Sequence, residues 1–474
     1  MEKQTTSKSA DATLPQAASD HQQRSQSDLL AETARRATHY LAGLNERSVF
    51  PTPDALTGLT AFDDSLPEGP RDPLEVLALL DEAGSPATVT SASGRYFGFV
   101  IGGALPASLA ANWLAGAWDQ NAGPRVASPT AAKLEQVALR WLLDVLGLPK
   151  DAGAGFVSGA TMANFSGLAA ARHAVLTQVG WDVEAHGLFG APPITVIVGD
   201  EVHVSLLKAL SLLGLGRERV VRVPVDNQGR MIASAIPRIS GPTILCIQAG
   251  NVNSGAFDPA HEICFIAHEA GAWVHVDGAF GLWAATAPTR SHLSAGVSEA
   301  DSWATDAHKW LNVPYDSGLV FCRHISELRA ALTHSRAAYL AEGEEREPME
   351  YTPEMSRRAR SVEIWAALRS LGRSGLAEMV DRCCRHAKQF AERLTAAGYE
   401  VLNDVQLNQV LVSFGDAEKT KRVIEAVQQD GTCWAGGTVW QGRTAMRISV
   451  SSWATTEADV EQSLEAILRV ASNV

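Results

Sequence analysis

The stretch Asp301-Ser302-Trp303-Ala304-Thr305-Asp306-Ala307-His308-Lys309-Trp310 is the most informative part of this chain, together with His275-Val276-Asp277-Gly278-Ala279-Phe280 before it. Lys309 stands among apolar and small residues, directly after a histidine. Burial disfavours the ammonium form of a lysine, so such a side chain can become the neutral amine that attacks carbonyl groups. Asp277 ends an apolar run and could hold a pyridine nitrogen protonated. Together, the two residues predict a pyridoxal phosphate site.

Length and composition are those of a soluble multi-lobed protein. The chain has 474 residues, of which 46% are hydrophobic and 20% charged, enough for two or three lobes with a large core. The net charge of -13 argues against nucleic acid or an anionic membrane as the main partner. No apolar run reaches the roughly 18 residues that span a membrane. Six scattered cysteines without a C-x-x-C pair are typical of reduced thiols, which predicts a cytoplasmic protein.

Short apolar strands alternate with helices in the middle of the chain, which predicts a mostly parallel sheet flanked by helices. We assign residues 106–360 to this large cofactor-binding domain. Gly155, Asp200, Gly250 and Asp277 follow strands, and ligands of such sheets bind beyond the carboxyl ends of the strands. The expected helices are 106–120, 129–146, 161–178, 204–213 and 261–270, and the expected strands are 155–157, 194–198, 220–225, 243–248, 273–276 and 317–323.

The two ends of the chain differ from this middle part. Residues 1–28 are polar and predict a disordered tail, and residues 29–105 predict an N-terminal segment with a helix over 29–44 and an extended stretch over 51–73. Residues 361–474 predict a smaller α/β domain. Its expected helices are 362–371, 376–397 and one capped by Thr455 or Thr456, and its expected strands are 410–414 and 445–450.

Three turns could reach a ligand at the sheet edge. Ser158-Gly159-Ala160-Thr161 lies between a strand and a helix, where small residues and free amides favour an anion, although a plain tight turn has the same pattern. His203 could stack over a planar ring or transfer protons, or could simply start a helix. The loop 250–255 could offer amides to a polar ligand or could be only a turn.

Two alternatives for the central residues remain open at this stage. Lys309 could be an ordinary surface lysine with a buried stem. His275, Asp277, Asp306 and His308 could bind a metal ion, because two histidines and two aspartates suffice as ligands. Lys309 would be a poor neighbour for a cation, so we expect no metal.

At these residues the chain resembles the group II pyridoxal-phosphate decarboxylases of the aspartate-aminotransferase superfamily, over about Arg95 to Val450. The motifs that carry the resemblance occur in order, and they are 95–99, the turn and helix 158–172, His203, 255–259, Asp277 with Ala279, His308-Lys309-Trp310, and 356–361. The resemblance implies fold type I, with a large domain around a mostly parallel mixed sheet, a smaller C-terminal α/β domain and an N-terminal helical segment. It also implies a homodimer with shared active sites, in which the 29–105 segment and the apolar helix 106–120 lie at the interface.

The resemblance also implies roles for single residues. Lys309 would hold the cofactor as a Schiff base, Asp277 would pair with the pyridine nitrogen, and His203 would stack on the ring. The other expected cofactor contacts are Ala160, Thr161, Asn253, Ala279, Asp306 and His308. Tyr96, Phe97, Trp118 and Tyr351 are candidates for the amino acid pocket.

The implied activity is the removal of the α-carboxylate of an L-amino acid as carbon dioxide. The chain departs from the family at Asp306-Ala307, at Asn251-Val252-Asn253, and before Ser356, where the protonating tyrosine of the animal aromatic decarboxylases has no clear equivalent. Another lyase, such as an aldolase, therefore stays open. So does an aminotransferase, because Arg447 could clamp a carboxylate.

Overall fold

The computed structural model describes residues 16–333 and 346–474, and these form two compact units that divide after Thr90. The described part of the first unit is helical, with α1 (Gln16–Ala42), α2 (Pro53–Gly58), α3 (Pro73–Leu79) and the short helical turns Leu59–Phe62, Leu80–Gly84 and Ser85–Ala87. None of the described helices is both long and apolar enough to cross a membrane.

Two elements of this unit differ from the expectation. Helix α1 begins at Gln16 rather than at Leu29. The stretch expected to be extended contains α2, which Thr52 caps at the Ala55 amide and which starts with Pro53 in its first turn. Residues 1–15, the rest of the expected tail, lie outside the described residues.

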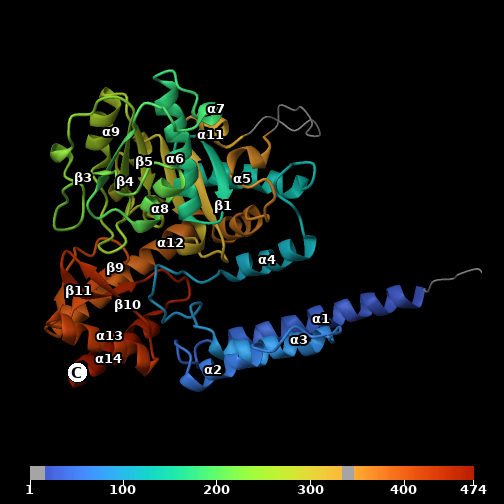
Figure 1. Cartoon of the computed structure of the whole chain (residues 1–474). Coiled ribbons are helices and arrows are strands. Elements are labelled where there is room, and N and C mark those ends of the chain that lie inside the picture. The colour runs from blue at the N-terminus through green and yellow to red at the C-terminus, as the bar shows by residue number, and fades with distance from the viewer. Residues whose placement is uncertain (1–15, 334–345) are drawn as a thin grey trace, which may run out of the picture. The chain divides into compact units, whose positions relative to one another are not determined.

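The second unit contains a seven-stranded mixed sheet in the order β1-β7-β6-β5-β4-β2-β3 (Figure 1). The five strands β6, β5, β4, β2 and β3 run parallel to one another, whereas β7 is antiparallel to both β6 and β1. The bounds are β1 (Gly153–Val157), β2 (Thr195–Gly199), β3 (Val221–Val223), β4 (Thr243–Gln248), β5 (Trp273–Asp277), β6 (Ser302–Asp306) and β7 (Gly318–Cys322).

Alternate residues of each strand enter two different cores, which makes the domain three-layered. On one face, Val196 and Ile244 pack with the helices α6 (Ala160–Thr177), α8 (Val204–Leu212) and α11 (Ile325–Leu332). On the other face, Leu245 and Val274 pack with α5 (Pro129–Val145) and α9 (Ala260–Glu269) and with the long α12 (Ser361–Ala396). The sheet is therefore buried on both sides, and its functional edge is where the strands end.

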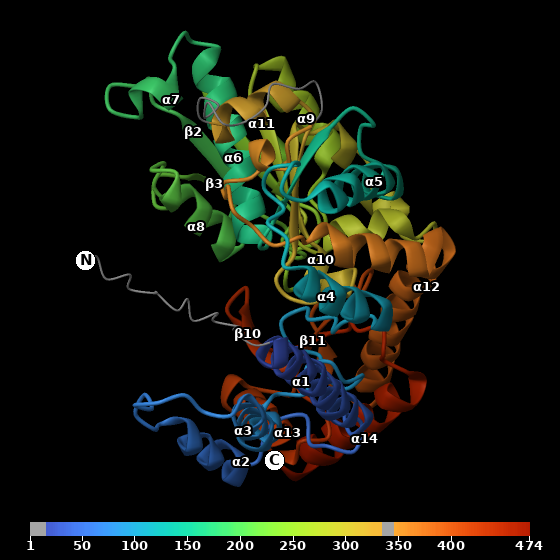
Figure 2. The same cartoon turned by 90° about the vertical axis from the view of Figure 1, so that its right-hand side faces the viewer.

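A four-stranded antiparallel sheet in the order β10-β11-β9-β8 forms the C-terminal part. Figure 2 shows α12 running from the level of the large sheet to this small one. Within α12, Gly372 has a φ of 60°, which is why the sequence suggests two helices that meet there. The remaining bounds are α4 (Pro106–Trp118), α7 (Val183–His186), α10 (Ala307–Trp310), α13 (Ala417–Asp430), α14 (Glu457–Asn473), β8 (Glu400–Val401), β9 (Gln409–Ser413), β10 (Gly436–Trp440) and β11 (Arg443–Ser449).

The sequence did not reveal every element. The first half of the opening stretch is strand β6, which was not expected because Ser302, Thr305 and Asp306 interrupt its apolar character. These polar groups are nonetheless buried, since the strand lies between β5 and β7. At the other end of the chain, Thr456 rather than Thr455 caps α14, and Asp459 completes a capping box.

Candidate active site

Lys309 lies on α10, the single helical turn that follows strand β6. Its Nζ atom is 3.1 Å from Oδ2 of Asp306, the last residue of the strand, and its side chain is 18% exposed. Asp306 is almost fully buried. The lysine therefore reaches from a buried carboxylate towards a partly open space at the sheet edge, and it is not the snorkelling surface lysine that the sequence left open.

The turn between β1 and α6 meets the same carboxylate. The Ala160 amide donates a hydrogen bond of 2.5 Å to Asp306 Oδ1, and the residue before the helix, Gly159, has no side chain to cap it. The close approach of β7 requires a glycine at Gly318, since a Cβ there would lie 2.5 Å from the Cα of Gly159. Thr161 follows Ala160 at the start of the 18-residue helix, so the N-terminal amides and the positive end of the dipole face the site.

Asp277 ends strand β5 beside β6. Its Oδ2 accepts a hydrogen bond of 3.1 Å from the Asn164 amide, and its Oδ1 accepts one of 3.3 Å from the Ala279 backbone N–H. The Ala279 carbonyl in turn accepts the Asp306 amide at 2.8 Å. These bonds fix the position of a buried carboxylate next to the strand that leads to Lys309.

Two histidines at the site are neutral for the same physical reason. Burial lowers the pKa of His203 and of His308. His203 caps α8 and its Nδ1 accepts the Ser205 amide at 3.2 Å, which leaves the Nε2 proton for a ligand. Lys309 and Arg447 lower the pKa of His203 further, whereas Asp277 and Asp306 raise it, so His203 lies within the field of all four charges.

His308 is held from two sides. Its Nδ1 accepts the Ser317 amide at 3.0 Å, and its ring stacks on Tyr315 with 4.2 Å between ring centroids. Its Nε2 is 3.5 Å from Asp306 Oδ1. Tyr315 was not a candidate from the sequence, because it lies in a loop after the lysine motif and matches none of the motifs considered.

Asn253, an expected cofactor contact, is bonded to the small sheet. Its Oδ1 accepts hydrogen bonds from Thr438 Oγ1 at 3.0 Å and from Arg447 Nη1 at 3.3 Å, both on strands of the small sheet. Burial lowers the pKa of Arg447, although a guanidinium remains charged at neutral pH. Asn253 therefore positions Arg447, which was singled out from the sequence as a possible carboxylate clamp.

The candidates for the amino acid pocket fall in different places. Phe97 is fully buried and packs edge-on against Phe390, so it belongs to the core. The guanidinium of Arg346 lies over the Tyr351 ring, 3.7 Å from the ring centroid. Trp118 ends α4 with 43% of its surface exposed.

Tyr96 is the pocket candidate with an aromatic partner. It stacks on Trp434 with 5.2 Å between centroids, and Phe99 stacks on the other side of the same indole at 5.4 Å. Just beyond them, a Cβ at Gly102 would lie 2.2 Å from the Lys309 carbonyl, so this segment passes directly beside the lysine. Trp434 was missed because it comes from the small domain, far away in sequence.

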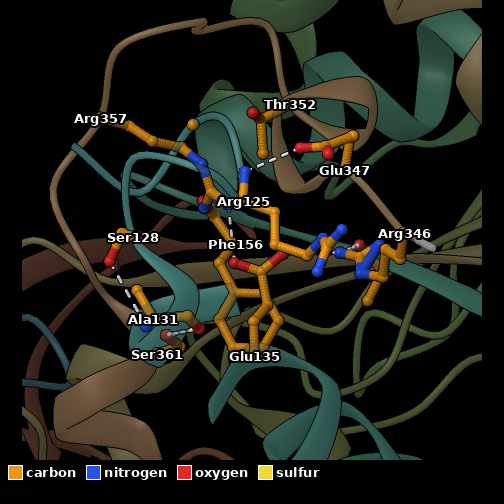
Figure 3. Close-up of polar contacts among 12 residues, drawn as sticks. Arg125, Ser128, Ala131, Glu135, Phe156, Arg346, Glu347, Thr352, Arg357 and Ser361 are labelled. Atoms are coloured by element: carbon orange, nitrogen blue, oxygen red, sulfur yellow. Dashed lines mark hydrogen bonds and ion pairs between the residues drawn. The ribbon is translucent and has the colours of Figure 1, made fainter. Parts of the chain in front are cut away.

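The segment that follows the undescribed residues 334–345 is anchored to α5 and β1 by buried charges (Figure 3). The two oxygens of Glu135 accept hydrogen bonds from Arg346 and Arg357, each at 2.6 Å. Arg346 also donates to the Ala154 carbonyl and Arg357 to the Phe156 carbonyl, at 2.7 and 3.1 Å. These contacts hold 346–357 against the strand that leads into the phosphate turn.

The metal alternative does not fit this arrangement. Both ring nitrogens of His275 are engaged, at 2.8 Å by Ser302 and at 2.8 Å by Asn164. Within residues 16–333 and 346–474, no group of three or more His, Cys, Asp and Glu side chains is placed to hold a metal ion. The groups that converge on Lys309 suit instead an aldehyde with a phosphate and a pyridine nitrogen, because a lysine, a helix N-terminus and a buried carboxylate share one edge.

Comparisons with known proteins agree with this class of site. Residues 58–415 match the model of the pyridoxal-dependent decarboxylase conserved domain. An aromatic-L-amino-acid decarboxylase from Bacillus atrophaeus is 26% identical, over 91% of this chain and 92% of that protein. An acidic amino acid decarboxylase from Bos taurus is 27% identical, over 63% of this chain and 59% of that protein.

Solved structures confirm the fold. The structure of Oryza sativa TDC with PLP and tryptamine superimposes with a TM-score of 0.87 at 22% identity, over 98% of this chain and 99% of that one. Mouse CSAD gives a TM-score of 0.84 at 20% identity, over 94% of this chain and 99% of that one.

Fold and site thus define a fold type I enzyme that uses pyridoxal phosphate. The chain belongs to the pyridoxal-dependent decarboxylase family, since the family model covers well over half of it. It is a carboxy-lyase that acts on an amino acid, as the resemblance implied.

Proposed function

We propose that this enzyme removes the α-carboxylate of an L-amino acid as carbon dioxide, with the cofactor bound covalently to Lys309. The observation that carries the proposal is the convergence on Asp306. This one buried carboxylate contacts the Lys309 amine at 3.1 Å and the Ala160 amide at 2.5 Å. The Lys309 amine and the N-terminus of α6 therefore meet at the two oxygens of one carboxylate.

Pyridoxal phosphate, when bound, supplies a conjugated ring that accepts the electron pair left when carbon dioxide departs. The chain's own residues would hold it in place. Ala160 and Thr161 at the start of α6 would hold the phosphate, with His308 beside them. Asp277 would supply the negative charge that keeps the pyridine nitrogen protonated. Neutral His203 would pack against the ring, and it holds a proton at Nε2 that it could transfer.

Arg447 is the group we assign to the substrate carboxylate. It is partly buried, it acts on the pKa of His203, and Asn253 accepts a hydrogen bond from one of its nitrogens. A guanidinium offers two parallel donors to a carboxylate, so it can orient the bond that breaks. The same residue favours the second candidate, aminotransfer, since a firmly clamped carboxylate is retained rather than lost.

The covalent link can be tested by spectroscopy. We expect the purified protein to show a visible absorption band from bound pyridoxal phosphate that disappears on borohydride reduction, with the label on Lys309 in peptide maps. The Lys309→Ala variant should take up no label. A label on another lysine, or none on the wild type, would refute the assignment.

The reaction can be tested by supplying single amino acids and measuring carbon dioxide and the corresponding amine. Equal amounts of both support decarboxylation. Conversion of the bound cofactor to its pyridoxamine form without carbon dioxide would establish aminotransfer, and products that keep their carboxyl group without that conversion would establish another lyase.

We also propose that the protein acts as a cytoplasmic homodimer with shared active sites. All six cysteines are free thiols in the interior, as expected in a reducing compartment. Helix α4 leaves Trp113, Leu114 and Trp118 between 43% and 55% exposed, and such an apolar patch is typical of an interface. Analytical ultracentrifugation should give a dimer mass, and Trp113→Glu should shift the protein towards the monomer.

A further inference from the structure

A chain of buried side chains leads away from Asp277 into the space between the sheet and α6. Asn164 on α6 donates to Asp277 Oδ2 at 3.1 Å, and its Oδ1 lies 2.8 Å from His275 Nε2. The other nitrogen of His275, Nδ1, lies 2.8 Å from Ser302 Oγ. Ser302 Oγ accepts a hydrogen bond of 2.9 Å from the indole N–H of Trp273. The middle three residues are fully buried.

The carboxylate at one end of this chain fixes the direction of its protons. Asp277 accepts from the Asn164 NH₂ group, so the Asn164 oxygen faces His275 Nε2 and accepts a proton from it. His275 is neutral, because burial lowers its pKa to about 3, and its single proton is then on Nε2. Nδ1 therefore accepts from the Ser302 hydroxyl, whose oxygen accepts from the Trp273 indole N–H. Each donor thus points towards the carboxylate.

The fold makes room for this chain at one glycine. Helix α6 crosses His275 at Gly167, where a Cβ would lie 2.7 Å from Cε1 and 2.9 Å from Nδ1 of the imidazole. A larger residue there would push the ring out of line with Asn164 and Ser302. The glycine, the histidine and the asparagine are therefore matched in shape as well as in hydrogen bonding.

We propose that Trp273, Ser302, His275 and Asn164 are positioning residues that fix the orientation and the charge of Asp277. An N–H group aimed at a carboxylate oxygen stabilises the ionised form of that carboxylate. The hydrogen bonds behind Asn164 prevent its side-chain amide from rotating by half a turn. The negative carboxylate then keeps the cofactor's pyridine nitrogen protonated. The inference rests on the assignment of Asp277 to that nitrogen under the proposed function.

The chain also gives a use to His275, which the sequence marked only as a possible metal ligand. No contact of His275 with the cofactor is required, since its effect passes through Asn164. The consequence is specific: disturbing the chain should matter only for a cofactor that has a ring nitrogen for Asp277 to bind.

The test compares two cofactors on the full-length protein, pyridoxal phosphate and its 1-deaza analogue, in which C–H replaces the ring nitrogen. Dissociation constants are measured for wild type, Asn164→Leu, Ser302→Ala and Gly167→Ala. Loss of one buried hydrogen bond should weaken pyridoxal phosphate binding about 5- to 10-fold. Affinity for the analogue should stay within about twofold, because its ring makes no bond to Asp277.

Ser166→Ala is the matched control for Ser302→Ala. Ser166 is equally buried on α6, and among the described residues its hydroxyl bonds only to the Met162 carbonyl, so both affinities should match those of the wild type. Equal losses for the two cofactors in the chain variants, or no loss for either, would overturn the inference. Because the three variants lie at different positions, the test can still be read if one of them fails to fold.

Asp277→Asn separates this inference from the proposed function. If Asp277→Asn abolishes the preference for pyridoxal phosphate over the analogue while the chain variants keep it, the carboxylate assignment stands and the positioning chain is wrong. If Asp277→Asn keeps the preference, Asp277 does not bind the ring nitrogen, and the assignment and this inference both fail.

Discussion

At the scale of single residues, Asp306 and His275 show how burial decides chemistry. Asp306 is 2% exposed and accepts bonds from both the phosphate turn and Lys309, so one side chain connects the two ends of the cofactor site. His275 is kept neutral between Ser302 and Asn164. Neither environment can be read from residue type, because each depends on partners from other strands and helices.

The neutral state of His275 predicts a pH dependence of stability. The pKa of His275 is about 3 in the folded protein and about 6.5 in the unfolded chain. Between these two values the unfolded chain binds a proton at this residue and the folded protein does not. This residue should lower the free energy of unfolding by about 1.4 kcal/mol for each pH unit between 6 and 4. Urea unfolding of wild type and His275→Gln should show that the variant lacks this part of the slope, whatever its stability at pH 7. Parallel curves would contradict it.

At the scale of elements, the turn between β1 and α6 depends on how closely β7 approaches it. Gly318→Ala would place a methyl group 2.5 Å from the Gly159 Cα. All three of its nearest neighbours would be backbone atoms of Gly159, which can move only if the turn itself shifts. We expect the turn to shift and pyridoxal phosphate to bind at least about 10-fold more weakly, because phosphate contacts depend on backbone position. Fluorescence titration measures the affinity. Gly375→Ala on α12, where a Cβ would make only ordinary contacts of 3.5 and 3.7 Å with Leu371, is the control and should bind as the wild type does.

A second element, the segment 346–361, is anchored by the ion pairs of Glu135. Glu135→Gln would leave Arg346 and Arg357 without their buried counter-charge, and breaking such a pair costs about 3 to 5 kcal/mol. Guanidinium unfolding should report a loss in this range. Glu461→Gln, which breaks a half-exposed surface pair with Arg393, should cost less than about 1 kcal/mol. Equal losses in the two variants would show that burial adds nothing to the Glu135 pairs.

At the scale of the whole molecule, a hydrogen bond links the large sheet to the small one. Arg447 on strand β11 donates it to Asn253, which lies in the loop after strand β4. We expect Arg447→Met to raise KM for the amino acid by about 10-fold or more with little change in pyridoxal phosphate affinity, since a charge-assisted bond to the substrate carboxylate is lost. Steady-state kinetics and cofactor titration measure the two effects separately. A fall in cofactor affinity with an unchanged KM would place Arg447 at the cofactor instead. Arg443→Met on the same strand, in a surface pair with Glu400, is the control.

The sequence alone predicted most of the strands and helices in their order, the residues at the carboxyl ends of those strands, and Lys309 through its motif, because local periodicity and short motifs carry that information. Even the break in α12 at Gly372 could be predicted, since a glycine in the left-handed region stops a helix locally. It missed β6, β10 and α13, whose polar residues mask their burial or their pairing.

Which residues meet was settled by tertiary packing. Asn164 lies one turn after the phosphate turn and is the one amide in a helix otherwise rich in alanine, which was a usable signal. Arg447 stood out as a possible carboxylate clamp, whereas Ser302 and Trp434 offered no signal. Packing moved Phe97 into the core, turned Asn253 towards Arg447 and placed His275 behind Asp277. The physical reason is that bonds such as Asn164–Asp277 and Ala160–Asp306 join segments more than 100 residues apart, whereas sequence patterns report only neighbours along the chain.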